Sequence, residues 1–211
     1  MSMRFSVIAR QGLVLLLVWL IGAMALVLSG AWPYSAPLFA LAVLTVYLYR
    51  DLPRRIPPRP NAIVSPLDGT ILSIENGHDP YCERDALRIE AITHWNGPYV
   101  LRSPMEGKVV EQWFSPGSRG EDGEYQSPMM AMWIRNDEDD DLVLVVTPRS
   151  RWLRMSCRAH AGERVGHGRR CGFIPLGARI EVFLPVNARV EIQAGQKVTA
   201  GDSILAQLIH K

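Results

Sequence analysis

Hydrophobic and polar positions follow different patterns in the two parts of this chain. Residues 12–30 read GLVLLLVWLIGAMALVLSG and residues 36–49 read APLFALAVLTVYLY, and neither run carries a charge. The first run is close to the roughly 20 apolar residues with which a helix crosses a bilayer. Because only the short turn AWPYS separates the two runs, we predict an N-terminal transmembrane helical hairpin, a membrane-anchoring domain over residues 1–50.

Arginine residues flank this predicted hairpin on both sides. Arg4 and Arg10 precede it, and Arg50, Arg54 and Arg55 follow it. Because positive charge marks the cytoplasmic ends of membrane helices, we predict an inner (plasma) membrane protein whose remaining chain is cytoplasmic. A cleaved secretory signal peptide is the alternative, since a basic segment before an apolar run is also typical of that signal.

A Pro/Arg-rich segment, DLPRRIPPRPNA, follows at residues 51–62. Proline makes such a segment stiff and extended, so we predict a linker between two domains. Its arginines either lie along anionic lipid headgroups or serve only as a topology signal.

From residue 63 onward the chain consists of short β-branched or alternating runs separated by Gly, Pro, Asn and Asp, a pattern typical of strands and turns. The predicted strands are GTILSIEN (69–76), ALRIEAI (86–92), GKVVEQWF (107–114), MMAMWIRN (129–136), DLVLVVTP (141–148), ARIEVFLP (178–185), ARVEIQA (188–194) and SILAQLI (203–209). We predict an all-β domain over residues 63–211.

A weak internal repeat lies within this β domain. AGERVGHG (161–168) and AGQKVTAG (194–201) share the pattern A-G-x-x-V-x-x-G, and MEGKVVEQ (105–112) is a partial third copy. Such glycines permit tight turns, and the pattern recurs in barrel-sandwich modules such as lipoyl and biotinyl carriers. A carrier role is disfavoured because Lys108 follows a glycine at the start of a strand, whereas carriers display their lysine at a hairpin tip after methionine.

Charge and chemistry-bearing residues exclude several functions. The formal net charge is only +2, and no dense basic run with interleaved aromatics indicates nucleic-acid binding. The acidic run at residues 137–141 is predicted to be a solvated turn, since it lacks the glycine and distal glutamate of a calcium loop. Three cysteines and three of the five histidines are candidate metal ligands, but their spacing predicts no metal site; they are Cys82, Cys157, Cys171, His94, His160 and His167.

Several motifs together resemble the short bacterial and archaeal type of phosphatidylserine decarboxylase proenzyme. YLYRDLP (47–53) is similar to the FFRDP exit of the family's hydrophobic hairpin, SPLDG (65–69) to SPADG, GPYVLRSPMEG (97–107) to NVHVNRAPVSG, and GHGRRCGFIPLGARIEVFLP (166–185) to the block ending in FGSRVDVYLP. The order and spacing hold over nearly the whole chain. The resemblance implies a hydrophobic hairpin followed by a β domain of barrel-sandwich type.

The resemblance also implies which residues carry the chemistry. The family's proenzyme cleaves itself between the glycine and serine of its GS motif, and the serine becomes a pyruvoyl group, the electron sink for decarboxylation. A histidine and an aspartate activate that serine. Asp68 matches the aspartate and Gly177 the glycine, but Tyr99 stands at the histidine position and Ala178 at the serine position.

These substitutions lead to a prediction about activity. Alanine has neither a nucleophile for the acyl shift nor a leaving group for the elimination, so no pyruvoyl cofactor is expected at Ala178. We predict a catalytically inactive relative of the decarboxylase that serves phosphatidylserine and phosphatidylethanolamine metabolism as a lipid-binding or regulatory partner. The alternative is an active decarboxylase that works by an unrecognised route.

An arginine cluster is the candidate ligand-binding feature. Arginine binds phosphate with two parallel hydrogen bonds, and the predicted ligand-binding residues are Arg149, Arg151, Arg154 and Arg179, with Arg158, Arg169 and Arg170 as further members. A solvated strand face is the competing interpretation. The expected partners are membrane phospholipid and either an active decarboxylase or a second copy of this chain.

Overall fold

A computed structural model describes residues 10–115, 117–119, 125–126, 128–150 and 155–209. The chain forms two compact units, residues 1–53 and residues 54–211.

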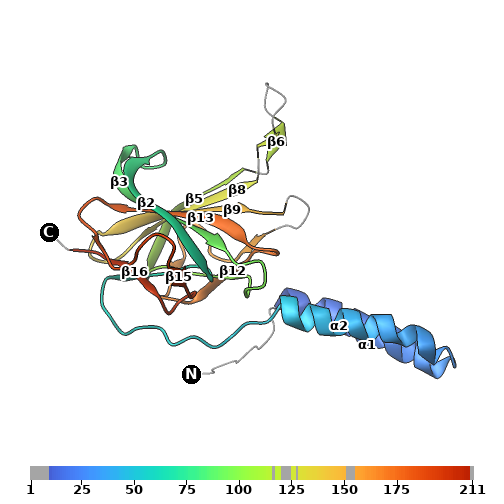
Figure 1. Cartoon of the computed structure of the whole chain (residues 1–211). Coiled ribbons are helices and arrows are strands. Elements are labelled where there is room, and N and C mark those ends of the chain that lie inside the picture. Colours follow the sequence, from blue (N-terminus) through green and yellow to red (C-terminus); the bar gives the residue numbers. More distant parts are fainter. Residues whose placement is uncertain (1–9, 116, 120–124, 127, 151–154, 210–211) are drawn as a thin grey trace. The chain divides into compact units, whose positions relative to one another are not determined.

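The first unit is a helical hairpin. It consists of α1 (Arg10–Leu28), the short 3-10 helix η1 (Trp32–Ser35) and α2 (Ala36–Leu48), with α1 and α2 lying side by side (Figure 1). A glycine shortly after Leu28 terminates α1, since Gly30 has φ +81°. The Gly30 N–H donates to Val27 O (3.1 Å), and the Ala31 N–H donates to Leu26 O (3.0 Å). This pair of bonds satisfies the last carbonyl groups of the helix, and glycine adopts the required left-handed conformation without strain.

The prediction of a transmembrane hairpin is wrong. Within the described part of the chain, neither helix is long and apolar enough to cross a membrane. The 13 residues of α2 rise only about 20 Å, against a hydrocarbon core of about 30 Å. The apolar pattern therefore identified two helices and the turn between them, but it overestimated what their lengths can span.

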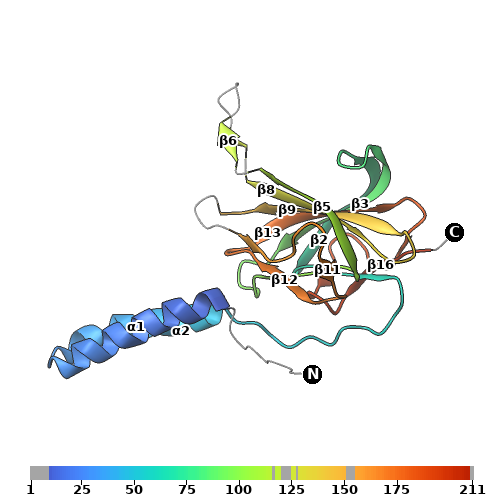
Figure 2. The same cartoon turned by 180° about the vertical axis from the view of Figure 1, so that it is seen from behind.

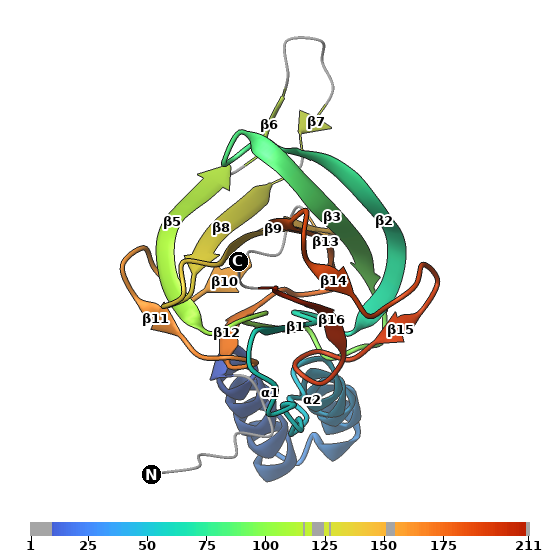
Figure 3. The same cartoon turned by 90° about the vertical axis from the view of Figure 1, so that its left-hand side faces the viewer.

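The second unit is built on one curved antiparallel sheet. Its strand order is β11 (Arg164–Val165), β5 (Gly107–Ser115), β8 (Met129–Arg135), β9 (Asp141–Pro148), β13 (Ala178–Pro185), β3 (Arg84–Thr93), β2 (Gly69–Asp79) and β15 (Lys197–Val198). Figure 3 shows the sheet curled into a half-barrel. The expected barrel-sandwich is thus replaced by a half-barrel, because the predicted strands join one continuous ladder.

Three smaller sheets complete this unit. Their strand orders are β1 (Ala62–Val64), β16 (Ile204–Gln207) and β14 (Arg189–Val190); β10 (Ser156–Cys157), β12 (Arg170–Phe173) and β4 (Val100–Arg102); and β6 (Ser118–Arg119) with β7 (Tyr125–Gln126). The first two close the open side of the half-barrel (Figures 2 and 3).

The central strands are apolar on both faces, and the structure explains why. In β9, Leu142, Leu144 and Val146 pack into the main core, while Val143 and Val145 join a second cluster on the opposite face. A strand that is covered on both sides reads as a continuous apolar run. The run DLVLVVTP therefore belongs in the middle of the sheet, where it pairs with β8 and β13.

The weak repeat is a full structural repeat of two copies. The first copy contains β1, β2, β14, β15 and β16, and the second contains β4, β5, β10, β11 and β12. SPLDG (65–69) leads into β2 and SPMEG (103–107) leads into β5, while the two A-G-x-x-V-x-x-G segments form the two edges of the sheet. The β1–β16 pairing of the first copy and the β4–β12 pairing of the second each contain one register shift. The shift leaves Leu205 without a paired residue in the first copy and Cys171 without one in the second.

The hydrogen bonds of the two copies correspond one to one. The bonds of the first copy are Ile71 N–H to Gln196 O (3.0 Å), Gly195 N–H to Ile71 O (2.8 Å) and Gly201 N–H to Ser65 O (2.8 Å). The matching bonds of the second copy are Val109 N–H to Glu163 O (2.9 Å), Gly162 N–H to Val109 O (2.8 Å) and Gly168 N–H to Ser103 O (3.0 Å). The two copies also exchange bonds, since the Val64 N–H donates to Pro104 O and the Arg102 N–H donates to Pro66 O.

Glycine is required at the matching positions 69 and 107. A Cβ atom on Gly69 would lie 2.2 Å from Ile92 O, and one on Gly107 would lie 2.3 Å from Arg135 O. Real Cβ atoms do not approach a backbone oxygen this closely, so any side chain would push neighbouring strands apart. The motifs SPLDG and SPMEG therefore end in glycine for the same steric reason.

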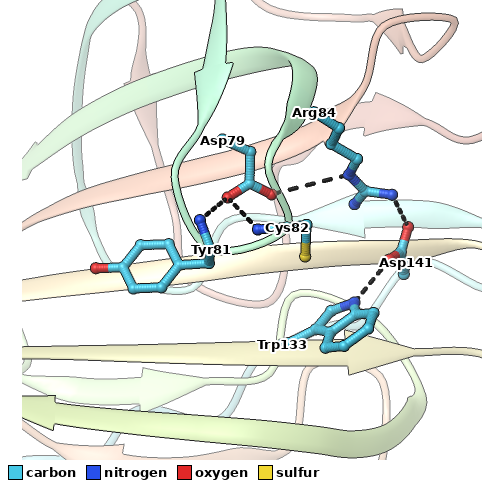
Figure 4. Close-up of polar contacts among 6 residues, drawn as sticks. All are labelled: Asp79, Tyr81, Cys82, Arg84, Trp133 and Asp141. Atoms are coloured by element: carbon cyan, nitrogen blue, oxygen red, sulfur yellow. Dashed lines mark hydrogen bonds and ion pairs between the residues drawn. The ribbon is translucent and has the colours of Figure 1, made fainter.

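A buried charge network ties the β2–β3 turn to the sheet (Figure 4). Asp79 is fully buried and accepts the backbone N–H groups of Tyr81 (2.9 Å) and Cys82 (3.4 Å). Arg84 lies between two carboxylates, with Nη1 2.7 Å from Asp141 Oδ1 and Nε 3.8 Å from Asp79 Oδ2. The Trp133 indole N–H donates to the other Asp141 oxygen (2.6 Å).

Cys82 lies in this turn as an unreactive thiol. Burial and the negative charge of Asp79 raise the pKa of Cys82 to about 11. Because the thiolate is the reactive form, this cysteine is a poor nucleophile near neutral pH.

We predict that Arg84→Met lowers the free energy of unfolding by about 3 kcal/mol, because it leaves the two buried carboxylates Asp79 and Asp141 without their cation. The matched control is Arg164→Met, which removes an equally close but exposed pair with Asp137 (2.6 Å) and should have a much smaller effect. Urea unfolding followed by tryptophan fluorescence measures both. Equal losses in the two variants would contradict a specific role for the buried network.

Candidate functional site

The candidate site is the turn that leads into β13. Residues 174–177 form a turn closed by the Gly177 N–H donating to Ile174 O (3.1 Å). Pro175 suits the second position of such a turn, and Leu176 has φ +62° and Gly177 φ +81°. Two successive left-handed residues, one of them a leucine, make this a strained corner.

Ala178 is sealed inside the corner. It is 1% exposed. Its backbone N–H donates to Thr93 Oγ1 (3.1 Å), and the Thr93 hydroxyl donates in turn to Ala178 O (2.9 Å). The hydroxyl at this corner therefore belongs to Thr93, and both of its bonds hold the backbone of residue 178.

Asp68 lies beside the same strand end. The His94 N–H donates to Asp68 O (3.3 Å), and Thr93 pairs with Gly69 across β2 and β3. The Asp68 carboxylate is occupied on both oxygens: Oδ1 accepts the Ala200 N–H (2.6 Å), and Oδ2 pairs with Arg54 Nη2 (2.5 Å). The carboxylate is thus held in place by a backbone donor and a partly buried cation.

Tyr99 packs into the core on the other side of the loop that follows β3. It is 2% exposed, and its ring meets Phe173 edge to face at 6.5 Å between centroids. Its hydroxyl donates to Trp95 O, and its backbone carbonyl accepts the Ile174 N–H (2.8 Å) at the start of the corner. Tyr99 therefore closes the loop and supports the turn, because its hydroxyl is bonded within its own loop.

The structure brings some of the predicted site residues together and separates others. The segment from Thr93 to Tyr99 connects the predicted catalytic positions. Asp68 accepts the His94 N–H and Ala178 bonds to Thr93. Gly177 lies against Thr93, and Tyr99 is the last residue of the segment. Of the predicted ligand-binding arginines, Arg149 is exposed, with its N–H on Gly177 O (3.0 Å), and Arg179 pairs with Glu90 (2.5 Å). Arg151 and Arg154 lie outside the described residues.

Sequence reasoning missed Thr93 and Arg54 as parts of this site. Thr93 directly follows a predicted strand, which placed it near the site but gave no sign of which partner its hydroxyl would meet. Arg54 was assigned to the linker, and its pairing with Asp68 spans 14 residues of chain. Only the folded chain shows both contacts.

Other nucleophiles and metal ligands do not compensate at the corner. Burial raises the pKa of the Cys171 thiol well above its usual value, so it stays protonated. Among the described residues, no three His, Cys, Asp or Glu side chains are arranged to hold a metal ion.

The amino-acid sequence of this chain matches known proteins. The model of the phosphatidylserine decarboxylase family matches residues 99–206. The phosphatidylserine decarboxylase proenzyme of Nitrosomonas eutropha is 32% identical over 205 residues, 95% of each chain, and that of Burkholderia multivorans is 31% identical over 212 residues, 99% of each chain. The proenzyme of Aromatoleum aromaticum is 32% identical over 207 residues, 95% of each chain. No solved structure matches. This chain belongs to the phosphatidylserine decarboxylase family.

The family's self-derived pyruvoyl group does not fit this corner. Such a group takes its carbon skeleton from the serine at the cleavage point, whose esterified oxygen is lost by elimination before water hydrolyses the resulting imine to the ketone. The residue at this position is an alanine, which is buried and has no oxygen to eliminate. Thr93 cannot replace it, because cleavage by the Thr93 hydroxyl would leave Ala178 with an amine instead of a ketone.

We predict that Gly177→Ala destabilises the protein more than Gly195→Ala does. Both glycines have nearly the same left-handed φ (+81° and +82°), but a Cβ at 177 would lie 2.8 Å from Thr93 Cβ, while nothing lies within 4 Å at 195. Backbone strain alone costs on the order of 1 kcal/mol, and the clash should add about 2 kcal/mol at position 177.

Chemical unfolding of the two variants measures the difference directly. Because Gly195→Ala carries the same backbone strain, it isolates the contact with Thr93. Equal losses of unfolding free energy would show that the corner tolerates a side chain against Thr93.

Proposed function

We propose that this protein acts in phosphatidylserine and phosphatidylethanolamine metabolism as a family member that does not process itself at residue 178. The observation that supports the proposal most strongly is the corner itself: Ala178 lacks an oxygen, is buried, and is held on both backbone polar groups by Thr93. Asp68 is occupied by Arg54, and Tyr99 is bonded within its own loop. No arrangement of these groups can convert alanine into a pyruvoyl group.

On this proposal the retained fold serves lipid recognition or regulation. Its partners are membrane phospholipid and either an active decarboxylase or a second copy of this chain. We place the protein at the cytoplasmic surface of the inner membrane. The exposed apolar side chains of the helical hairpin support this location: Val14, Ile21 and Leu28 are 64%, 68% and 80% exposed. Apolar surface of this extent favours contact with a lipid or protein surface without requiring that the hairpin cross it.

A second candidate function is phosphatidylserine decarboxylation itself. Family membership favours it, because the relatives that match over nearly the whole chain are named decarboxylase proenzymes. This function requires an electron sink that does not derive from residue 178.

We predict that the purified protein has the intact mass of the unbroken 211-residue chain and releases no carbon dioxide from phosphatidylserine vesicles. Ala178→Ser alone should also stay uncleaved, because Tyr99 cannot accept the serine proton near neutral pH. Adding Tyr99→His supplies a candidate base at the position of the family's histidine and should give slow cleavage at most. Denaturing electrophoresis, intact mass and carbon dioxide release are the measurements.

The control for these variants is Ala200→Ser, which adds a serine at the backbone donor to Asp68, away from the corner, and should never cleave. Efficient cleavage of Ala178→Ser would show that the remaining machinery is intact. Carbon dioxide release by the natural chain would favour the second candidate function over the first.

A further inference from the structure

An arginine-lined pocket lies on the second copy of the repeat, on residues separate from the corner. Its volume is about 160 Å³. We call it the arginine pocket. Its charged lining residues are Arg158, Arg164, Arg169, Arg170 and Glu163. Four arginines and one glutamate therefore line a concave site.

The counter-charges near this pocket do not neutralise it. Arg164 is paired with Asp137 through two bonds (2.6 and 2.9 Å), and Glu163 accepts the His160 backbone N–H (3.1 Å). Within the part of the chain that the structure describes, the side chains of Arg158 and Arg169 have no acidic or hydrogen-bonding partner. Both guanidinium groups are thus available to an external anion.

Backbone bonds bring these arginines together from distant parts of the sequence. The Arg158 N–H donates to Cys171 O (2.7 Å), so Arg158 lies beside the start of β12, which begins at Arg170. The Arg169 N–H donates to Gly166 O (3.0 Å) and closes the turn between β11 and β12. The positions of these charges are therefore set by the fold.

Gly166 makes room for one of the arginines. A Cβ atom at Gly166 would lie 2.7 Å from Arg169 Cδ and 2.9 Å from its Nε, so the arginine side chain lies directly over the glycine backbone. In the first copy of the repeat, the matching residue is Thr199, and the Ser203 N–H donates to its carbonyl (3.0 Å) as the Arg169 N–H does to Gly166 O. Glycine and arginine occur together in one copy, and threonine and serine in the other.

The first copy acts as an internal comparison for the whole pocket. Its backbone makes the matching bonds, since the Glu191 N–H donates to Leu205 O (3.0 Å) as Arg158 does to Cys171 O. At the positions of the pocket residues Arg158, Glu163, Arg164, Arg169 and Arg170, the first copy has Glu191, Gln196, Lys197, Ser203 and Ile204. The same turns and strands thus form with a net charge of 0 in one copy and +3 in the other. The fold does not require arginine at these positions.

We infer that the arginine pocket binds a phosphate ester. Arginine presents a planar fork of N–H donors that matches phosphate oxygens, and a cluster of like charges with unengaged members is stabilised by a bound anion. The pocket volume suits a phosphate group with a small substituent. The ester is either the headgroup phosphate of an anionic phospholipid or a soluble phosphate monoester. This inference does not depend on the proposed function, because the pocket shares no residue with the corner around Ala178.

The test compares two double variants of the full-length chain. Arg158→Gln/Arg169→Gln removes two charges from the arginine pocket. Arg189→Gln/Lys197→Gln removes two charges from exposed positions of the first copy, on strands β14 and β15. Each protein is titrated calorimetrically with sn-glycerol 3-phosphate at low salt, and sedimented with vesicles of phosphatidylcholine alone or mixed with phosphatidylglycerol.

We expect the pocket variant to bind at least about tenfold more weakly than the natural chain, and the first-copy variant to stay within about twofold. A loss in the glycerol phosphate titration identifies a soluble ester as a ligand. A loss of the phosphatidylglycerol-dependent part of vesicle binding identifies a lipid headgroup. The vesicles without phosphatidylglycerol separate this part from any binding by the apolar hairpin.

Two results would overturn the inference. One is a natural chain that binds neither probe better than the pocket variant does. The other is an equal loss in both double variants, which would show a diffuse electrostatic attraction and no site. Circular dichroism of each variant checks that the β unit is intact, and all four substituted residues are exposed.

Discussion

The β unit depends on two places where the backbone of one strand passes against the carbonyl of another. A Cβ atom on Gly69 would lie 2.2 Å from Ile92 O, and a Cβ atom on Gly107 would lie 2.3 Å from Arg135 O. This approach lets β15 pair with the start of β2 and β11 with the start of β5, so that each edge of the large sheet ends in a short, turned strand. Short edge strands offer little backbone for pairing with other chains. The two copies of the repeat then lock to each other through the bonds between Val64 and Pro104 and between Arg102 and Pro66.

The same arrangement also forms the corner at the start of β13. β13 lies between β9 and β3, and its first residue, Ala178, is delivered to Thr93 at the end of β3. Asp68 directly precedes Gly69, so the glycine that permits the strand approach also brings the aspartate to the same end of β3. None of these contacts requires a serine at residue 178, because the turn is held by backbone bonds and by the left-handed conformation of Gly177. The corner therefore forms with alanine at this position.

Charges in this protein divide by burial into two kinds. Arg84 and Arg54 each neutralise a buried carboxylate and hold a segment of chain in place. Arg158 and Arg169 lie at the surface, make no such pair among the described residues, and occupy positions where the first copy has Glu191 and Ser203. The physical distinction matters for function, because an arginine that neutralises an internal carboxylate is committed to the fold, while one without a partner can bind a ligand.

The sequence alone determined the local features. Apolar runs and glycine identified two helices and the turn between them, alternation and turn residues identified the main strands, and the motif order identified the family. The residue at position 178 also needs no structure, since an alanine cannot supply a pyruvoyl group. The hydropathy pattern wrongly predicted a transmembrane hairpin, because a 13-residue helix such as α2 is too short to span a bilayer.

Tertiary structure decided what depends on contacts between distant residues. The half-barrel follows from the pairing of β13 with both β9 and β3, and strand patterns do not specify partners. Thr93 forms hydrogen bonds with Ala178, which lies 85 positions away in the sequence. Asp68, just before β2, pairs with Arg54, which the sequence placed in a linker. In the sequence, the repeat was recognisable only as an eight-residue pattern. The matching hydrogen bonds showed that it extends to five strands in each copy. Sequence patterns report how a residue behaves within its own element, whereas a site is made by the elements that the fold brings beside it.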